Sequence, residues 1–440
     1  MQKKHISRKS FIITVAATAA GCAPNSKNKR AQQPVPVRPF SANEKLNVAG
    51  IGIGGQGYGD IERCASHNIV ALCDVDWAKA ARTFKKFPKA KKYKDFRVML
   101  EKQKDIDAVV IATPDHTHAS AAMTAIQLGK HVYCEKPLTH SVYEARRLAE
   151  AARGAKVATQ MGNSGQASQK SRLMCDYIWD GAIGRVREVH VWSNRPIWPQ
   201  QVERPTEVHP VPDTLDWDLW LGPAPKRPFN TIYHPFRWRG WWDFGTGALG
   251  DMGCHAFHPI FRALKLGHPT SVQATSTYNG RVNEETYPLA STVHYQFPAR
   301  GKMPPLRLTW YDGGLKPRRP NELEQGHDLE EGGTLFLGDK GAMLGHRLIP
   351  DAKQLEYGRP PKRLPPSPGH FEEWFEACKG GKPAGANFDV AGLVTEVVLL
   401  GNVALRIGKK LEWDGSNMQF VGMPKANQHL RRQYRHGWTL

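Results

Sequence analysis

An acid and an imidazole stand four residues apart in the segment Gly247-Ala248-Leu249-Gly250-Asp251-Met252-Gly253-Cys254-His255. On a helix, residues with this spacing share one face, so Asp251 and His255 would lie side by side. The pair suits alcohol oxidation, in which a base takes the hydroxyl proton while hydride leaves the same carbon. Two alternatives stay open: a helix-capping Asp beside a buried core His, or a metal site. A metal needs further ligands, and because only His258 is near, no metal is expected.

A glycine-rich turn, Gly52-Ile53-Gly54-Gly55-Gln56-Gly57, follows the apolar run 46–51. Gly52 allows a tight turn, Gly54 lets the backbone approach a pyrophosphate, and Gly57 lets the next helix pack closely on the strand. The N-terminus of that helix offers free N–H groups and a positive dipole end to phosphates. The spacing therefore predicts a dinucleotide-binding turn.

An aspartate, Asp74, ends the next apolar run, 69–73, and lies 22 residues after Gly52. A carboxylate at this position would accept hydrogen bonds from the adenosine ribose hydroxyls and would repel a 2′-phosphate. We therefore expect NAD as the cofactor, with NADP less favoured. Asp76 is a nearby rival for the same role.

Polar groups also follow two other strand-like runs. The run 105–112 leads into Thr113-Pro114-Asp115-His116-Thr117-His118, and the run 131–134 leads into Glu135-Lys136-Pro137. Loops at the carboxyl ends of parallel strands face the ligand crevice, so we expect Thr113, Pro114 and His118 beside the cofactor. The Lys136 ammonium can position or polarise a substrate hydroxyl. Glu135 can pair with that ammonium or contact the cofactor ribose.

The segments GIGGQG, TPDHTH and CEKP are followed much later by GALGDMGCH. In these segments, and over about residues 45–415, the chain resembles the glucose–fructose oxidoreductase/inositol dehydrogenase (Gfo/Idh/MocA) family. The resemblance implies that Lys136 lies beside the nicotinamide and the substrate. It also implies that His255 is the base, that Asp251 orients it, and that the protein forms homo-oligomers.

Tryptophans concentrate between residues 192 and 242. There Trp238, Arg239 and Trp241 combine flat apolar faces with a charged group, as carbohydrate sites do. We expect these three residues to contact a carbohydrate substrate, with ordinary aromatic packing as the alternative for each Trp. Asn163, which follows the strand-like run 156–160, is a further candidate to face the substrate.

The elements that would position these residues change in character near residue 165. Before it, apolar runs alternate with helical stretches, which predicts an α/β Rossmann domain with a doubly wound parallel sheet at 45–165. After it, runs rich in Val, Thr and aromatic residues predict strands at 186–193, 271–278, 291–297, 306–311 and 334–338. Helices are expected at 370–378 and 389–407. Together with the resemblance, this pattern predicts an α+β C-terminal domain at 166–415, with a large, mainly antiparallel sheet that serves substrate binding and oligomerisation.

The first 23 residues combine a basic stretch, a short apolar run and small residues, as secretion signals do. Residues 7–11 resemble a twin-arginine signal with Lys9 in place of the second arginine, and residues 19–22 resemble a lipoprotein box that would leave Cys22 lipid-modified. We expect an exported protein, periplasmic or membrane-anchored, with a Pro-rich linker at 24–44. Much of the net charge of +20 falls in the N-terminal segment and in a basic tail at 416–440, so no nucleic-acid partner is expected.

These features predict an NAD(P)-dependent oxidoreductase that transfers hydride between a nicotinamide and a hydroxyl of a sugar, glycoside or inositol-like polyol. The alternative is an NAD-dependent glycoside hydrolase, which oxidises a ring hydroxyl transiently, eliminates the aglycone and reuses its cofactor. Because free nicotinamide cofactors are scarce outside the cytoplasm, an exported enzyme of either kind should hold its NAD tightly.

Overall fold

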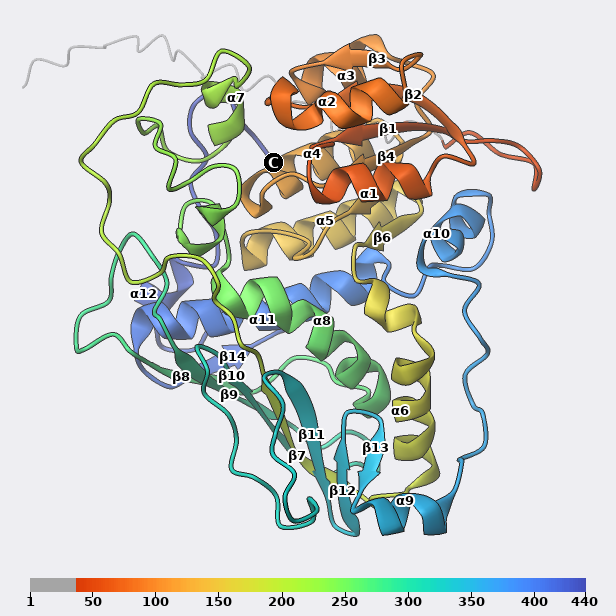
Figure 1. Ribbon diagram of the computed structural model, residues 1–440, viewed down its shortest axis with the longest axis vertical. Coiled ribbons are helices and arrows are strands. Elements are labelled where there is room, and N and C mark those ends of the chain that lie inside the picture. The colour runs from red at the N-terminus through yellow and green to blue at the C-terminus, as the bar shows by residue number, and fades with distance from the viewer. Residues whose placement is uncertain (1–36) are drawn as a thin grey trace, which may run out of the picture. The chain divides into compact units, whose positions relative to one another are not determined.

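The computed structural model describes residues 37–440 (Figure 1). The expected signal at 1–23, its lipoprotein box at Cys22 and most of the linker at 24–44 lie outside the described residues, so these features stay predictions. Within residues 37–440, all six cysteines are free and buried.

Six parallel strands form the first sheet, in the order β3-β2-β1-β4-β5-β6. This is a Rossmann strand order, so the expected doubly wound parallel sheet is confirmed, and its switch point lies between β1 and β4. The loops after these two strands, which hold the glycine-rich turn and Thr113, therefore meet at one edge. The unpredicted strand, β3, has only three residues and no apolar alternation. The strands are β1 Asn47–Ile51, β2 Asn68–Cys73, β3 Lys91–Tyr93, β4 Ala108–Ile111, β5 His131–Cys134 and β6 Thr159–Met161.

Helices cover both faces of this sheet. Apolar residues of α3 (Phe96–Lys102), α4 (Asp115–Gln127) and α5 (Val142–Ala155) pack on one face. The other face is covered by α1 (Gln56–Arg63), α2 (Trp77–Lys86) and a helix from much later in the chain, α10 (His370–Cys378). In α10, Phe371 stacks on Tyr133 of β5 with ring centroids 4.5 Å apart. The first domain is thus completed by residues far outside 45–165.

The second sheet has nine strands in the order β13-β12-β11-β7-β10-β9-β8-β14-β15. Only β7 and β10 pair in parallel, so the expected mainly antiparallel sheet is confirmed. The strands are β7 Val186–Trp192, β8 Ser271–Ser276, β9 Ser291–Phe297, β10 Leu306–Tyr311, β11 Gly333–Gly338, β12 Gly341–Leu344, β13 Arg347–Ile349, β14 Leu411–Asp414 and β15 Gln419–Phe420. Helices α6 (Gln169–Asp180) and α9 (Asp351–Tyr357) lie beside this sheet, near β12 and β13 (Figure 1).

Two long helices connect the sheets, α8 (Gly247–Leu264) and α11 (Phe388–Ile407). Helix α11 packs against α5, α8 and β8, and its apolar side chains join the cores of both sheets. Its mean hydropathy of 1.7 over 18 residues would suit a membrane span, but 78% of that stretch is buried inside the fold, as in the core helix of a folded domain. Arg146 of α5 pairs with Glu396 of α11 at 2.7 Å (Nη2 to Oε2), which ties α11 to the first domain.

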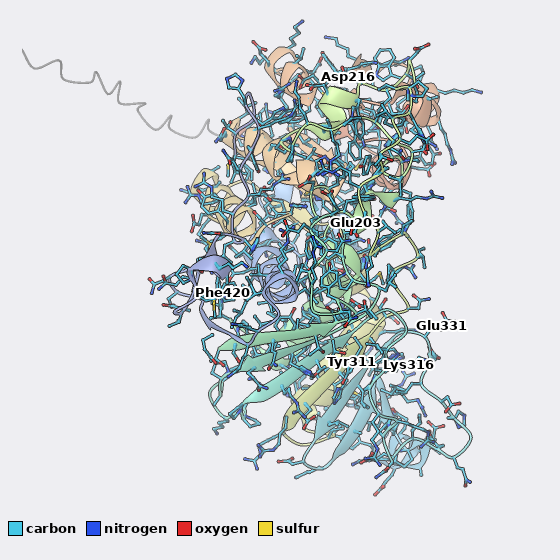
Figure 2. The ribbon with its side chains drawn as sticks, turned by 90° about the vertical axis from the view of Figure 1, so that its left-hand side faces the viewer. Glu203, Asp216, Tyr311, Lys316, Glu331 and Phe420 are labelled. Atoms are coloured by element: carbon cyan, nitrogen blue, oxygen red, sulfur yellow. The ribbon has the colours of Figure 1, made fainter. Side chains whose placement is uncertain are left out.

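The segment 193–246, between β7 and α8, runs from the second sheet to the first domain. Figure 2 shows Glu203 midway along the molecule and Asp216, which precedes α7 (Trp217–Leu221), beside the first domain. The backbone N–H of Asp216 donates to the carbonyl of Val75 at 2.9 Å, and that of Trp77 donates to Thr214 at 3.1 Å. The segment is therefore attached directly after β2, within reach of the edge where a dinucleotide would lie.

The basic tail at 416–440 packs back onto the fold. Phe420 of β15 is buried against Trp413 at one side of the molecule (Figure 2), and a short helix, α12 (Pro424–Asn427), follows. Arg432 Nε then donates to the buried carboxylate of Glu144 at 2.8 Å. Glu144 also completes the capping box of α5 with Ser141. The tail thus supplies the cation that neutralises a buried acid of the first domain.

We expect Arg432→Ala to destabilise the protein by about 3–5 kcal/mol, because it leaves the buried Glu144 carboxylate without its counter-ion. The matched control is Arg431→Ala, whose exposed side chain stacks on Tyr143 and should cost less than about 1 kcal/mol. Denaturant and thermal midpoints measure both changes. Equal midpoints for the two variants would contradict this role of the tail.

Candidate functional site

An ion pair joins the two domains at the carboxyl edge of the first sheet. Lys136, directly after β5, donates from Nζ to Asp251 Oδ1 at 2.9 Å and to the Asp251 carbonyl at 3.0 Å. Arg239 Nε donates to the same Oδ1 at 3.3 Å. The side chains of Lys136 and Asp251 are only 16% and 14% exposed, so the pair is shielded from water while remaining open to a ligand.

The two cations determine the charge of Asp251. Burial raises the pKa of this carboxyl, but the charges of Lys136 and Arg239 outweigh burial, and the net pKa lies below its usual value. Asp251 is therefore an anion near neutral pH, and Lys136 and Arg239 are held against it. This arrangement fixes where the Lys136 ammonium points.

His255 lies one turn further along α8, and Asn163 determines its tautomer. The Asn163 amide nitrogen donates to the Cys254 carbonyl at 2.7 Å and lies 3.2 Å from His258 Nδ1. Because a carbonyl can only accept, the Asn163 oxygen must face the other way, and it lies 3.0 Å from His255 Nδ1. His255 Nδ1 therefore carries the proton, which leaves a lone pair on Nε2.

The same surroundings keep His255 neutral. Burial, assisted by the charge of Lys136, lowers the pKa of His255 to about 4. Nε2 makes no hydrogen bond to any residue in 37–440. A neutral imidazole with a free Nε2 lone pair can accept a proton from a ligand hydroxyl.

The expected Asp251–His255 hydrogen bond is not formed. Both residues lie on α8, as their spacing predicts, but Asp251 holds Lys136 and Arg239, while Asn163 orients His255. Asn163 was expected to face the substrate, and instead it is fully buried behind the imidazole. This role depends on a contact between positions 92 residues apart, for which the sequence carries no local signal.

The glycine-rich turn has the geometry that its spacing predicts. Gly52 has φ of 75°, and a Cβ on Gly57 would overlap the carbonyl oxygen of Gly52, so only glycine fits there. A Cβ on Gly54 would lie 3.0 Å from Lys79 Cβ. No side chain caps the start of α1, and the N–H groups of Gly57 and Tyr58 turn back to the carbonyls of Gly54 and Gly55, at 3.1 and 3.2 Å. A phosphate at this end of the helix would meet the positive end of the helix dipole. These residues fit a dinucleotide pyrophosphate.

Asp74 and Asp76 have different roles. Asp74 Oδ2 accepts from the backbone N–H groups of Ile53 at 2.8 Å and Gly54 at 3.1 Å, so it shapes the glycine-rich turn. Burial raises the pKa of Asp74 to about 6. Asp76 caps α2 by accepting the backbone N–H of Ala78, and its other carboxylate oxygen lies in hydrogen-bond contact with His234 Nε2 at 2.8 Å. Asp74 is therefore the acid placed beside the turn, and Asp76 holds the segment 193–246.

The loop after β4 is held by histidines. His118 has one ring nitrogen 2.7 Å from the Thr113 carbonyl and the other 2.8 Å from the Pro137 carbonyl, which leaves no ring nitrogen for a cofactor. It was expected to bind the cofactor, and its contacts instead tie this loop to the turn of Lys136. Pro114 starts α4, and the Thr113 hydroxyl oxygen is buried without a hydrogen-bond partner in residues 37–440. Such an orphaned hydroxyl fits a polar ligand at this edge.

Glu135 does not pair with the Lys136 ammonium. Its carboxyl packs against Gly162 and accepts the backbone N–H of Lys136 at 3.2 Å. Burial, assisted by the nearby Asp60 carboxyl, raises the pKa of Glu135 to about 8. The raised pKa favours the protonated form of Glu135, which can donate a hydrogen bond. Its expected contact with a ribose stays a prediction.

The aromatic residues divide into two kinds. Trp241 has no exposed surface and packs edge-on against Tyr233, with ring centroids 4.7 Å apart, so the expected substrate contact is replaced by core packing. Trp238 is 7% exposed and lies under the Arg239 guanidinium, 4.2 Å from Cζ to the ring centroid. Trp238 therefore supports Arg239, which remains at the site. In residues 37–440 no group of three His, Cys, Asp or Glu side chains could hold a metal ion.

Comparison with known families agrees with this geometry. Residues 45–163 match the model described as "Oxidoreductase family, NAD-binding Rossmann fold" and residues 186–281 match "Oxidoreductase family, C-terminal alpha/beta domain". Both models describe the Gfo/Idh/MocA family, and the chain belongs to it.

Curated relatives match only part of this chain. An inositol 2-dehydrogenase of Salmonella typhimurium is 30% identical over 152 residues, 33% of this chain and 44% of the relative. A levoglucosan dehydrogenase of Pseudarthrobacter phenanthrenivorans is 33% identical over 107 residues, 24% of this chain and 27% of the relative. The matched part is thus less than half the length of either relative.

Solved structures share the two-domain fold. The WlbA dehydrogenase of Bordetella pertussis, in complex with NADH and UDP-GlcNAcA, has a TM-score of 0.59 at 18% identity, over 84% of this chain and 99% of that one. The aldose–aldose oxidoreductase of Caulobacter crescentus, complexed with glycerol, has a TM-score of 0.53 at 16% identity, over 84% and 100%. At this identity the likeness concerns the fold alone.

We expect NMR titration of the histidine side chains to give His255 a pKa of about 4 and an Nδ1–H tautomer, because burial disfavours the imidazolium and Asn163 accepts from Nδ1. His255→Gln assigns the signal. Asn163→Asp should raise this pKa, because a carboxylate beside Nδ1 stabilises the cation. A wild-type pKa near 6.5, or an Nε2–H tautomer, would contradict the geometry.

Proposed function

We propose that the protein is an NAD-dependent oxidoreductase that acts on a secondary hydroxyl of a sugar, glycoside or cyclic polyol. The observation that carries the proposal is the free Nε2 of neutral His255, set beside the Lys136 ammonium at the carboxyl edge of the Rossmann sheet. The names of the relatives, inositol 2-dehydrogenase and levoglucosan dehydrogenase, support a ring polyol or anhydrosugar as substrate.

The residues divide the work between binding and proton transfer. Bound NAD would supply hydride acceptance at the nicotinamide, and the glycine-rich turn with the start of α1 would hold its pyrophosphate. Lys136 donates a hydrogen bond to the substrate oxygen and stabilises negative charge that develops there. His255 Nε2 accepts the hydroxyl proton. Asp251 positions Lys136 by accepting a hydrogen bond from Nζ, and Asn163 positions His255 by accepting one from Nδ1.

Substitution of Lys136 by Met or of His255 by Ala should lower kcat/KM by about 10²- to 10⁴-fold, because each removes a group that acts on the reacting hydroxyl. The assay is NADH formation with myo-inositol, levoglucosan, glucose and a panel of glycosides. Lys102→Met, an exposed lysine on α3, is the matched control and should keep wild-type activity. Full activity in Lys136→Met would refute the site.

The cofactor's fate separates this proposal from the glycoside hydrolase alternative. The signal-like N-terminus supports tight binding of NAD, so mass spectrometry of denatured, freshly purified protein should detect it. Net NADH formation with a polyol supports the dehydrogenase. Cleavage of a glycoside with substoichiometric NAD and no net NADH would indicate the elimination route instead.

Asp74 should set the preference for NAD over NADP. Asp74→Ser removes the charge that repels a 2′-phosphate while keeping an oxygen acceptor for the turn, so the ratio of the NADP to NAD dissociation constants should fall by about 10-fold or more. Asp76→Asn keeps the cap of α2 and should leave the ratio unchanged. Fluorescence titration measures both constants. A change in the Asp76 variant alone would assign the role to Asp76.

A further inference from the structure

A cavity of about 350 Å³ lies between the tail and α11. Six separate stretches form its walls: the start of α5, residues 223–225, the residues around Trp242, Tyr287, the C-terminal half of α11, and tail residues 428–433. We call it the tail cavity. The glycine-rich turn, Lys136, Asp251 and His255 do not line it, so it is separate from the proposed catalytic site.

Its walls are strongly cationic. Arg406, Arg431 and Arg432 line the tail cavity, and the only carboxylate in the lining is Asp243, which pairs with Arg227. Arg432 is neutralised by Glu144. The charges of Arg406 and Arg431 therefore stay uncompensated at the cavity surface by any ion pair within residues 37–440.

Arg406 is the most unusual of these groups. It is half-buried, and its guanidinium lies 4.0 Å from the ring centroid of Trp242. Burial lowers the pKa of Arg406, and no hydrogen bond from a described residue offsets this cost. Partial burial of a cation is unfavourable without a hydrogen-bonded anion, so an anionic ligand would supply the missing partner.

Neutral groups in the same walls also lack partners. Asn402 is 6% exposed and donates to the Thr246 carbonyl at 2.9 Å, while its Oδ1 has no partner among residues 37–440. The Nε2 of His140 is likewise buried without a partner in that range. The cavity lining therefore offers Asn402 Oδ1 and His140 Nε2 to hydroxyl groups, and the Arg406 and Arg431 guanidinium groups to an anion. This combination suits a ligand that carries both hydroxyls and an anionic group.

We propose that the tail cavity is a second small-molecule site, which binds a hydroxylated anion such as a sugar acid or a sugar phosphate. Arg406 and Arg431 hold the carboxylate or phosphate, and Asn402 and His140 take hydroxyls. The volume suits a single sugar ring with its charged group. Asn402 also ties this wall to Thr246, the residue before α8, so the occupant lies one contact from the helix of the proposed catalytic site.

The test is calorimetric titration of the full-length protein at low salt with four probes: inorganic phosphate, glucose 6-phosphate, glucuronate and neutral glucose. We expect at least one of the anionic probes to bind with a dissociation constant of about 1 mM or tighter. Any binding of neutral glucose should be the same in the wild type and in Arg406→Met, because glucose carries no anionic group for this site. Phosphate and carboxylate probes together show which anionic group is preferred. No binding by any anionic probe would overturn the proposal.

Variants locate the binding. Arg406→Met should weaken the anion by about 10-fold or more, whereas Arg318→Met, an exposed arginine outside the cavity, should leave it unchanged. If Arg406→Met does not fold, Arg431→Gln provides the test, because Arg431 is exposed at the rim of the cavity. This substitution should weaken anion binding several-fold. A phosphate held at the glycine-rich turn would bind equally well in every variant, and that result would also overturn the proposal.

Discussion

The candidate site depends on the contact between Lys136 and Asp251, where the first sheet and helix α8 meet through charged atoms. Lys136 Nζ binds both the carboxylate and the backbone carbonyl of Asp251, so it is held to the helix itself and not only to a mobile side chain. Breaking such a shielded pair costs about 3–5 kcal/mol, because one charge stays buried alone. The contact thus links the first sheet to α8, the helix that also carries His255.

Further contacts hold the same edge rigid. Asp115, at the start of α4, accepts the Thr246 hydroxyl at 2.6 Å, which anchors the start of α8 to the first domain. Burial raises the pKa of Asp115 to about 7. His116 lies between the carbonyls of Trp220 and Phe244, at 2.9 and 3.2 Å, and so holds the segment 193–246. The TPDHTH loop is thus mainly a connector between domains, which explains why two of its side chains face backbone carbonyls and not a ligand crevice.

Local spacing was enough to predict several parts of the site and the fold. The roles of Gly52 and Gly57 follow from a six-residue turn, and the shared helix of Asp251 and His255 follows from their separation by four. The partners of these residues were not predictable in the same way. Asn163 reaches His255 across 92 residues, and Lys136 reaches Asp251 across 115, and neither pairing leaves a periodic trace.

Burial explains the other differences from the sequence. From the sequence, Trp241 and Trp238 were equally good candidates to contact a carbohydrate. In the structure Trp241 is fully buried against Tyr233, whereas Trp238 keeps some exposed surface. The strand expected at 156–160 begins at Thr159, because Lys156 ends α5 with φ of 56°. The composition of the tail indicates a solvated basic segment. The structure shows instead that Arg432 forms an ion pair with the buried Glu144.

The most direct test of the interdomain ion pair is a double-mutant cycle with Lys136→Met, Asp251→Asn and both together. The readout is the single-turnover rate of NADH formation on the NAD-loaded protein with its best polyol. Because the two residues act as a unit, the double variant should be about as slow as the slower single variant. Losses that simply multiply in the double variant, or single variants that react at the wild-type rate, would contradict the account.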